Sequence, residues 1–146
     1  MHQVLFLCTG NYYRSRFAEV LFNHLAAHAR LPWTAASRGL RVRPESGNVG
    51  PLSLHAAAGL TARGIPLPGE RMPLQVTTHD LTAADLIIAL KQAEHLPLMQ
   101  NLFPDFVSRA RYWHVHDLDA ALPPEALAEL QTLVEALIAE LSPSAR

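Results

Sequence analysis

Residues 4–19 read VLFLCTGNYYRSRFAE and contain the only cysteine of the chain. A run of apolar, β-favouring residues ends abruptly at Cys8, and a short polar loop with a glycine follows it. Beyond this loop the apolar residues recur at helical spacing, with Phe17, Leu21 and Leu25 on one face. This order predicts a buried strand, a tight loop and a helix, with the thiol at the point where the strand ends.

Strand-like and helical segments alternate along the rest of the chain. The expected strands cover 4–8, 33–37, 85–90 and 112–115, and the expected helices cover 15–30, 53–63, 91–102 and 124–141. Strands that are nearly all apolar and alternate with helices predict an α/β fold, in which a parallel sheet is covered by helices on both faces. Two stretches rich in proline and glycine, 41–52 and 64–80, are expected to be irregular loops that rim a pocket or lie on the surface.

Length and composition fit a single domain over residues 1–146. Hydrophobic residues make up 49% of the chain and charged residues 17%, below the roughly 25% of an average soluble domain, which predicts a compact and ordered chain. The net charge of -1 argues against a nucleic-acid partner, because binding to nucleic acid usually requires a strongly basic surface.

The expected location is the cytoplasm, without a membrane partner. The N-terminal MHQVLFLC lacks a basic leader, and its apolar run is too short for a secretory signal or a membrane span. A single cysteine excludes an intramolecular disulfide and a cysteine-rich zinc site. His114 and His116 would share one face of a strand, but no third ligand stands at a suitable spacing, so we expect no metal and no cofactor.

The loop after Cys8 has the features of a phosphate-binding cradle. Ligands of open α/β sheets bind beyond the carboxyl ends of the strands, where this loop is expected to lie. Successive N–H groups of residues 9–13 can form a concave anion nest, and the N-terminus of the following helix adds partial positive charge. Arg14 adds a planar fork of donors that suits two phosphate oxygens. The sequence therefore predicts an anion site with a sulfur atom at its floor.

The same cradle favours a chemical role for Cys8. Cations, N–H dipoles and a hydroxyl such as that of Ser15 stabilise the thiolate form of a cysteine. A thiolate below a bound phosphoryl group is placed for in-line attack, which would give a cysteinyl-phosphate that water later hydrolyses, while Arg14 neutralises the equatorial oxygens. The leaving oxygen then needs a proton, and Asp117 and Asp119, which follow the last expected strand, are both candidates for this acid.

This combination of residues resembles the low-molecular-weight protein-tyrosine phosphatases, in which a cysteine, five residues and an arginine-serine pair join the first strand to the first helix. The similarity continues through Ser37, Gly39, the Asn-Val-Gly stretch at 48–50, ADLIIAL at 84–90 and the late aspartate loop, and so covers most of the chain. It implies a three-layer Rossmann-like sandwich with a central four-stranded parallel sheet. It also implies a protein phosphatase whose preferred substrate is phosphotyrosine.

The resemblance further implies roles for individual residues. Cys8 would be the nucleophile, Arg14 the phosphate clamp and Asp117, rather than Asp119, the general acid. The implied substrate-binding residues are Thr9, Gly10, Asn11, Tyr12, Tyr13 and Ser15, of which Asn11 shapes the loop and Ser15 partners the thiolate. The implied partner is a phosphorylated protein or a small phosphomonoester.

The sequence departs from the usual pattern of this family at four positions. Tyr13 stands where relatives usually carry a second cysteine, and Arg16 stands where they carry a proline. Gly47 replaces an aromatic residue of the pocket wall, and Leu118 replaces the proline that usually follows the acid. These changes concern a protective disulfide and the substrate pocket, so phosphoarginine stays open as an alternative to phosphotyrosine.

Three other functions share parts of this pattern. A catalytically weak module that binds phosphate or phosphoproteins is favoured by the changes at Gly47 and Leu118. Arsenate reductases have a similar loop but move electrons through further cysteines, which this chain lacks, so an external thiol would have to take part. A phosphocysteine carrier of the sugar-transport type needs no arginine at the end of the loop, so Arg14 argues against it.

Overall fold

A computed structural model describes residues 1–43, 46, 48, 50–115 and 123–143. Within these residues, four parallel strands form one sheet in the order β2-β1-β3-β4. The strands are β1 (His2–Cys8), β2 (Trp33–Gly39), β3 (Leu86–Ala89) and β4 (Ala110–Tyr112). The helices are α1 (Arg14–His28), α2 (Leu54–Ala62), α3 (Thr78–Ala83), α4 (Gln92–Leu102), the short 3-10 helix η2 (Pro104–Arg109) and α5 (Pro123–Leu141). The predicted α/β class with a four-stranded parallel sheet is confirmed.

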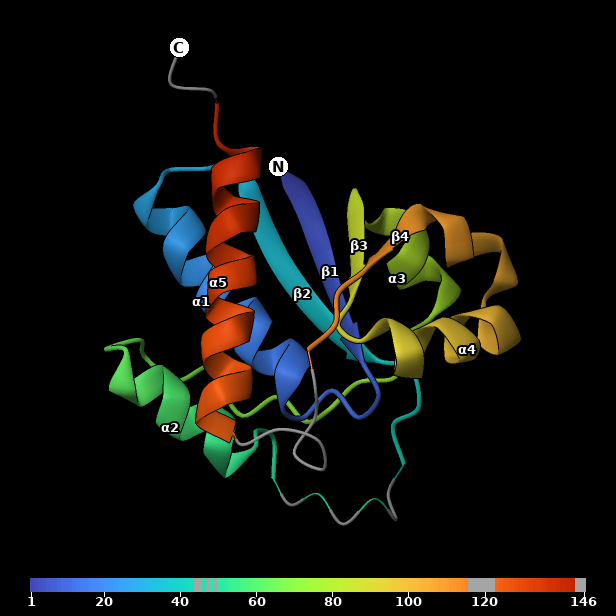
Figure 1. The fold of residues 1–146 in the computed structure, drawn as a ribbon, viewed down its shortest axis with the longest axis horizontal. Helices are drawn as coiled ribbons and strands as arrows, with labels where there is room; N and C mark the ends of the chain where they lie inside the picture. The colour runs from blue at the N-terminus through green and yellow to red at the C-terminus, as the bar shows by residue number, and fades with distance from the viewer. Residues whose placement is uncertain (44–45, 47, 49, 116–122, 144–146) are drawn as a thin grey trace.

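The sheet lies between two layers of helices, with α1 and α5 on one side and α3 and α4 on the other (Figure 1). The central strand β1 serves both layers because its side chains alternate between the two faces. Val4 and Phe6 belong to the apolar core beneath α1, α2 and α5, whereas Leu5 and Leu7 belong to the core beneath α3, α4 and η2. Both faces of β1 are therefore buried, which explains its continuous apolar sequence.

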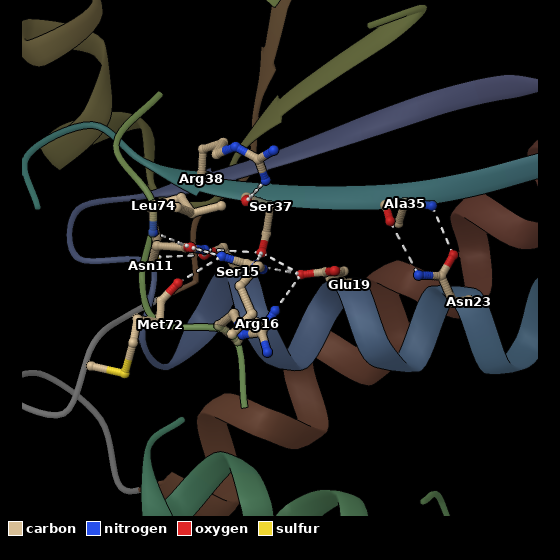
Figure 2. Close-up of polar contacts among 12 residues, drawn as sticks. Asn11, Ser15, Arg16, Glu19, Asn23, Ala35, Ser37, Arg38, Met72 and Leu74 are labelled. Atoms are coloured by element: carbon tan, nitrogen blue, oxygen red, sulfur yellow. Dashed lines mark hydrogen bonds and ion pairs between the residues drawn. The ribbon is translucent and has the colours of Figure 1, made fainter. Parts of the chain in front are cut away.

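The side chain of Asn23 joins α1 to the edge strand β2. Its Oδ1 accepts a hydrogen bond from the backbone N–H of Ala35 at 2.8 Å, and its Nδ2 donates to the carbonyl oxygen of Ala35 at 3.1 Å (Figure 2). Edge strands carry backbone groups that no neighbouring strand satisfies. Asn23 satisfies one such pair and fixes the position of the helix on which the anion loop depends.

Three elements differ from the sequence prediction, and one of them, the 3-10 helix η2, lies in a stretch where we expected no helix. The helix α3 begins near the end of the stretch 64–80, which we expected to be irregular. Its start is a capping box, in which the Thr77 side chain accepts from the Asp80 N–H and the Asp80 carboxylate accepts from the Thr77 N–H. The last strand was expected at 112–115, yet β4 covers Ala110–Tyr112, because these residues pair with β3. The apolar run after it continues beside β3 through a hydrogen bond from the Val115 N–H to the Leu90 carbonyl.

The carboxyl ends of β1, β2 and β3 meet at the edge of the sheet that carries the anion loop. The N–H of Leu40 donates to the carbonyl of Cys8 at 2.8 Å, and the N–H of Arg41 donates to the carbonyl of Thr9 at 2.9 Å. On the other side, the N–H of Leu90 donates to the carbonyl of Leu7 at 3.0 Å. The chain leaving β2 and the chain leaving β3 thus hold the start of the loop from both sides.

The close approach of Gly39 to this loop gives a test of the arrangement. A Cβ atom on Gly39 would lie 2.8 Å from the carbonyl oxygen of Thr9 and 3.1 Å from the backbone nitrogen of Asn11. Since backbone atoms cannot swing aside, we expect Gly39→Ala to lower the free energy of unfolding by about 1–3 kcal/mol and to weaken phosphate binding. Denaturant unfolding and calorimetric titration with phosphate measure the two effects. Gly69→Ala is the matched control, because no heavy atom lies within 4 Å of its added Cβ; equal stability of the two variants would contradict the prediction.

Candidate active site

Cys8 ends β1 and lies at the bottom of the loop, with only 2% of its surface exposed. Its sulfur is 2.9 Å from the hydroxyl oxygen of Ser15, a buried residue in the first turn of α1. The same hydroxyl oxygen accepts a hydrogen bond from Nδ2 of Asn11 at 2.9 Å. Either group can donate in the contact between Cys8 and Ser15, but a thiolate has no proton to give, so in that form the hydroxyl of Ser15 donates to the sulfur and stabilises it.

Asn11 gives the loop its shape. Its φ angle of 51° lies in the left-handed region, which asparagine tolerates better than most residues. Nδ2 donates to Ser37 Oγ in β2 as well as to Ser15, while Oδ1 accepts from the Leu74 N–H and from Arg71 Nη1, both at 3.0 Å. One buried amide therefore ties the loop to α1, to β2 and to the segment before α3 (Figure 2).

Glu19 collects a second set of donors behind the loop. Its Oε1 accepts from Ser37 Oγ, from Arg16 Nη1 at 3.0 Å and from Arg71 Nη2 at 3.2 Å. Burial, followed by the neighbouring charge of Arg16, lowers the pKa of Arg71, and the carboxylate of Glu19 opposes this change. Arg16 is 2% exposed, so the residue that replaces the usual proline is a buried partner of Glu19.

Arg14 is the first residue of α1, and its side chain is 3% exposed. Its Nη1 donates to the carbonyl oxygen of Val115 at 3.2 Å and forms an ion pair with Oε2 of Glu94 at 2.9 Å. Glu94 lies in the first turn of α4, which follows β3 at the same edge of the sheet. Sequence analysis did not single out Glu94.

A buried histidine completes this side of the loop and was also missed. Thr9 donates its hydroxyl proton to Oε1 of Glu94 at 2.8 Å, and the same hydroxyl lies 3.2 Å from Nε2 of His95. The N–H of Lys91 donates to Nδ1 of His95 at 2.9 Å, so the neutral ring carries its proton on Nε2 and donates it to Thr9. Burial, then the charge of Arg14, lowers the pKa of His95 to about 4.

The pKa of Glu94 is lowered as well. Burial acts in the opposite direction, but the hydrogen bond and charge of Arg14, together with the hydroxyl of Thr9, outweigh it. Glu94 is therefore a carboxylate at neutral pH, and His95 is uncharged. The only signal in the sequence that pointed to these two residues is their place just after an apolar strand, where the ligands of parallel sheets gather.

The structure brings most of the predicted site residues together in the segment between β1 and α1. This segment contains Thr9, Gly10, Asn11, Tyr12 and Tyr13, while Cys8 ends β1 before it and Arg14 and Ser15 begin α1 after it. Tyr13 is 6% exposed, belongs to the apolar core and contacts the ring of His55 edge-on, with 6.5 Å between the centroids. The predicted acid Asp117, its alternative Asp119 and the departures at Gly47 and Leu118 lie outside the described residues.

The two stretches expected to be loops meet beside the anion loop. Together they form a hollow of about 410 Å³ next to Gly10, lined on one side by Arg43 and Asn48 and on the other by Met72 and Leu74. Both stretches therefore rim a pocket, one of the two interpretations of their sequence. Among residues 1–43, 46, 48, 50–115 and 123–143, no group of three or more His, Cys, Asp or Glu could hold a metal ion. No helix within the described part of the chain is long and apolar enough to cross a membrane.

The model of a family described as low molecular weight phosphotyrosine protein phosphatase matches residues 3–144. The chain belongs to this phosphatase family. The sequence is 31% identical to a protein-arginine-phosphatase of Bacillus subtilis (strain 168) over 100 residues, which are 68% of this chain and 62% of that relative. The match thus spans less than two thirds of the relative's length.

Two solved structures have the same fold as this chain. The low molecular weight protein tyrosine phosphatase from T. tengcongensis is 27% identical, with a TM-score of 0.82 over 97% of this chain and 100% of that chain. YfkJ from Bacillus subtilis is also 27% identical, with a TM-score of 0.82 over 96% of this chain and 94% of that chain. The predicted family and fold are confirmed, and the description of the family agrees with the predicted enzyme class, the cysteine-dependent phosphatases among the hydrolases.

The buried histidine next to the phosphatase loop predicts a pH-dependent stability. The pKa of His95 is about 4 in the folded state and 6.5 in its ordinary state, so below pH 6.5 the unfolded chain binds a proton that the folded chain does not bind. We expect wild type to lose up to about 3 kcal/mol of unfolding free energy between pH 6.5 and 4, at 1.36 kcal/mol per pKa unit. Denaturant unfolding along this pH range should show a flatter profile for His95→Gln. The exposed His79→Gln is the control and should keep the wild-type slope; equal slopes in wild type and His95→Gln would contradict the assignment.

Proposed function

We propose that this protein hydrolyses phosphomonoesters of phosphorylated proteins through a cysteinyl-phosphate intermediate, with Cys8 as nucleophile, Arg14 as phosphate clamp and Asp117 as general acid. One observation carries the proposal: a buried thiol, 2.9 Å from the hydroxyl oxygen of Ser15, and a buried guanidinium stand at the two ends of the seven-residue segment from Cys8 to Arg14. A thiol and an arginine held in this way bind an oxyanion and attack its central atom. We also propose that residues 1–146 form one domain and act in the cytoplasm.

The first step transfers the phosphoryl group to sulfur. The N–H groups of the loop and the guanidinium of Arg14 hold the three terminal oxygens, and the thiolate of Cys8 attacks phosphorus in line with the ester oxygen. The S–P bond forms as the P–O ester bond breaks, and the leaving oxygen takes a proton from the carboxylic acid of Asp117. The products of this step are the free hydroxyl compound and the cysteinyl-phosphate.

The second step returns the enzyme to its starting state. A water molecule attacks phosphorus and gives a proton to the carboxylate of Asp117, while the S–P bond breaks and the thiolate of Cys8 leaves. The hydrogen bond from Ser15 stabilises the departing thiolate. The two steps use only backbone and side-chain groups of this protein and water, and inorganic phosphate is the final product.

Phosphotyrosine is the substrate that we propose first, because the matching family is named for phosphotyrosine protein phosphatases. Phosphoarginine is the second candidate, since the relative at 31% identity is called a protein-arginine-phosphatase. Hydrolysis rates of a phosphotyrosine peptide and a phosphoarginine peptide with the same flanking residues compare the two substrates directly. The preferred substrate is the one with the higher kcat/KM.

The nucleophile is tested with para-nitrophenyl phosphate at pH 5 to 8. We expect wild type to turn over and Cys8→Ser to lose at least about a thousandfold in kcat, because the serine hydroxyl is a far weaker nucleophile at these pH values. Calorimetric titration with inorganic phosphate is the control, and both proteins should still bind it. Retained turnover in Cys8→Ser would exclude the covalent mechanism, and phosphate binding without turnover in wild type would favour a phosphate-binding module.

The acid is tested with the matched pair Asp117→Asn and Asp119→Asn. Loss of the general acid slows substrates with poor leaving groups by about a hundredfold or more and hardly affects those with very good ones. We expect this dependence on leaving group for Asp117→Asn, measured as kcat across a series of substituted phenyl phosphates, and wild-type behaviour for Asp119→Asn. The reverse order would assign the acid to Asp119.

A further inference from the structure

The guanidinium of Arg14 is held in the protein interior by groups from two other segments. Its side chain is 3% exposed, and a charge at that depth requires a paired and hydrogen-bonded environment. Glu94 at the start of α4 and the carbonyl of Val115 after β4 both contact Nη1 of Arg14, at 2.9 and 3.2 Å. Two acceptors on one nitrogen restrict both the position of the guanidinium and the tilt of its plane.

Glu94 is itself held by a directional set of hydrogen bonds. The Lys91 N–H donates to Nδ1 of His95, Nε2 of His95 donates to the Thr9 hydroxyl, and this hydroxyl donates to Oε1 of Glu94. If the carboxylate rotated, the half-buried hydroxyl of Thr9 would lose its acceptor, and Nε2 of the buried His95, 3.6 Å from Oε2, also faces this carboxylate. The other oxygen, Oε2, is then directed at Arg14.

We propose that Glu94 is a positioning residue that sets the plane of the Arg14 guanidinium for phosphate, and that Thr9 and His95 hold Glu94 in place. The inference rests on the proposed function, because it takes Arg14 to be the phosphate clamp. A bidentate contact requires two N–H groups in the plane of two phosphate oxygens, so a tilted guanidinium loses one of two charged hydrogen bonds. Glu94 thus contributes to phosphate binding without contacting the phosphate.

Helix stability is the role that Glu94 would have without this function. A carboxylate in the first turn of a helix interacts favourably with the helix dipole. That role predicts a change in stability only, and it predicts the same change whether residue 14 is arginine or lysine. A positioning role predicts that the effect of Glu94 on phosphate depends on the planar group at position 14, because a lysine ammonium has no plane to orient.

The experiment is a double-mutant cycle between Glu94→Gln and Arg14→Lys. The readouts are kcat/KM for para-nitrophenyl phosphate and the dissociation constant of inorganic phosphate by calorimetry, with thermal unfolding as a check on folding. Glu129→Gln, at an exposed glutamate of α5, is the matched control. Thr9→Val and Thr9→Ser form a second pair, in which only the valine removes the hydroxyl that orients Glu94.

We expect Glu94→Gln to lower kcat/KM and weaken phosphate binding by about tenfold to a hundredfold, the usual effect of one charged hydrogen bond. In the Arg14→Lys background the same change should have less than about a twofold effect, and Glu129→Gln should have none. Thr9→Val should act in the same direction as Glu94→Gln, and Thr9→Ser should restore values near those of wild type. If Glu94→Gln does not fold, the Thr9 pair decides the question.

Three results would overturn the inference. They are wild-type phosphate affinity in Glu94→Gln, an equal effect of this change in both backgrounds, and equal values for Thr9→Val and Thr9→Ser. A wild-type protein that binds phosphate without turnover would refute the proposed hydrolysis, yet the phosphate cycle would still test the positioning role. A wild-type protein that binds no phosphate would refute both, because Arg14 would not be a clamp.

Discussion

The buried guanidinium of Arg14 is the constraint on which the arrangement of the site depends. A charge with 3% of its side chain exposed is stable only where a carboxylate and a carbonyl reach it, and here they come from α4 and from the chain after β4. These segments follow β3, which pairs with β1 in the parallel sheet, and β4, which pairs with β3. The order of the strands therefore brings together the anion loop and the groups that make a buried arginine tolerable at its end.

The opposite side of the loop is stabilised by the hydrogen bonds of Asn11 and by an ion-pair cluster around Glu19, and Arg71 takes part in both. Asn11 connects Ser15, Ser37 and the Leu74 N–H, and Glu19 gathers Arg16 and Arg71 behind it. The left-handed backbone of Asn11 is held by four hydrogen bonds of its side chain, which offset the strain of that conformation. The sulfur of Cys8 is thus held through Ser15 by the hydrogen bonds of Asn11, and on the other side of the loop Glu94 balances the charge of Arg14.

The sequence was sufficient to predict those parts of the site whose residues follow one another along the chain. The apolar strand, the glycine loop and the helical spacing after Ser15 are local signals, and each agrees with the fold. Glu94 was missed because it stands 85 positions after Thr9, and only the parallel pairing of β1 with β3 brings the two together. The helix α3 was missed for a different reason, since the proline and glycine before it concealed the capping box of Thr77 and Asp80.

Two departures from the usual family sequence leave intact the contacts that hold Cys8 and Arg14. Tyr13 places its ring in the apolar core, where a disulfide-forming cysteine would otherwise stand, and Arg16 pairs with Glu19 in the first turns of α1. The Nε of Arg16 has no hydrogen-bond partner among the described residues, which carries a cost in stability. Neither residue makes the contacts that hold Cys8 to Ser15 or Arg14 to Glu94. The groups that bind and attack phosphate are therefore set by contacts that these two substitutions do not remove, which favours an active phosphatase over a module that only binds phosphate.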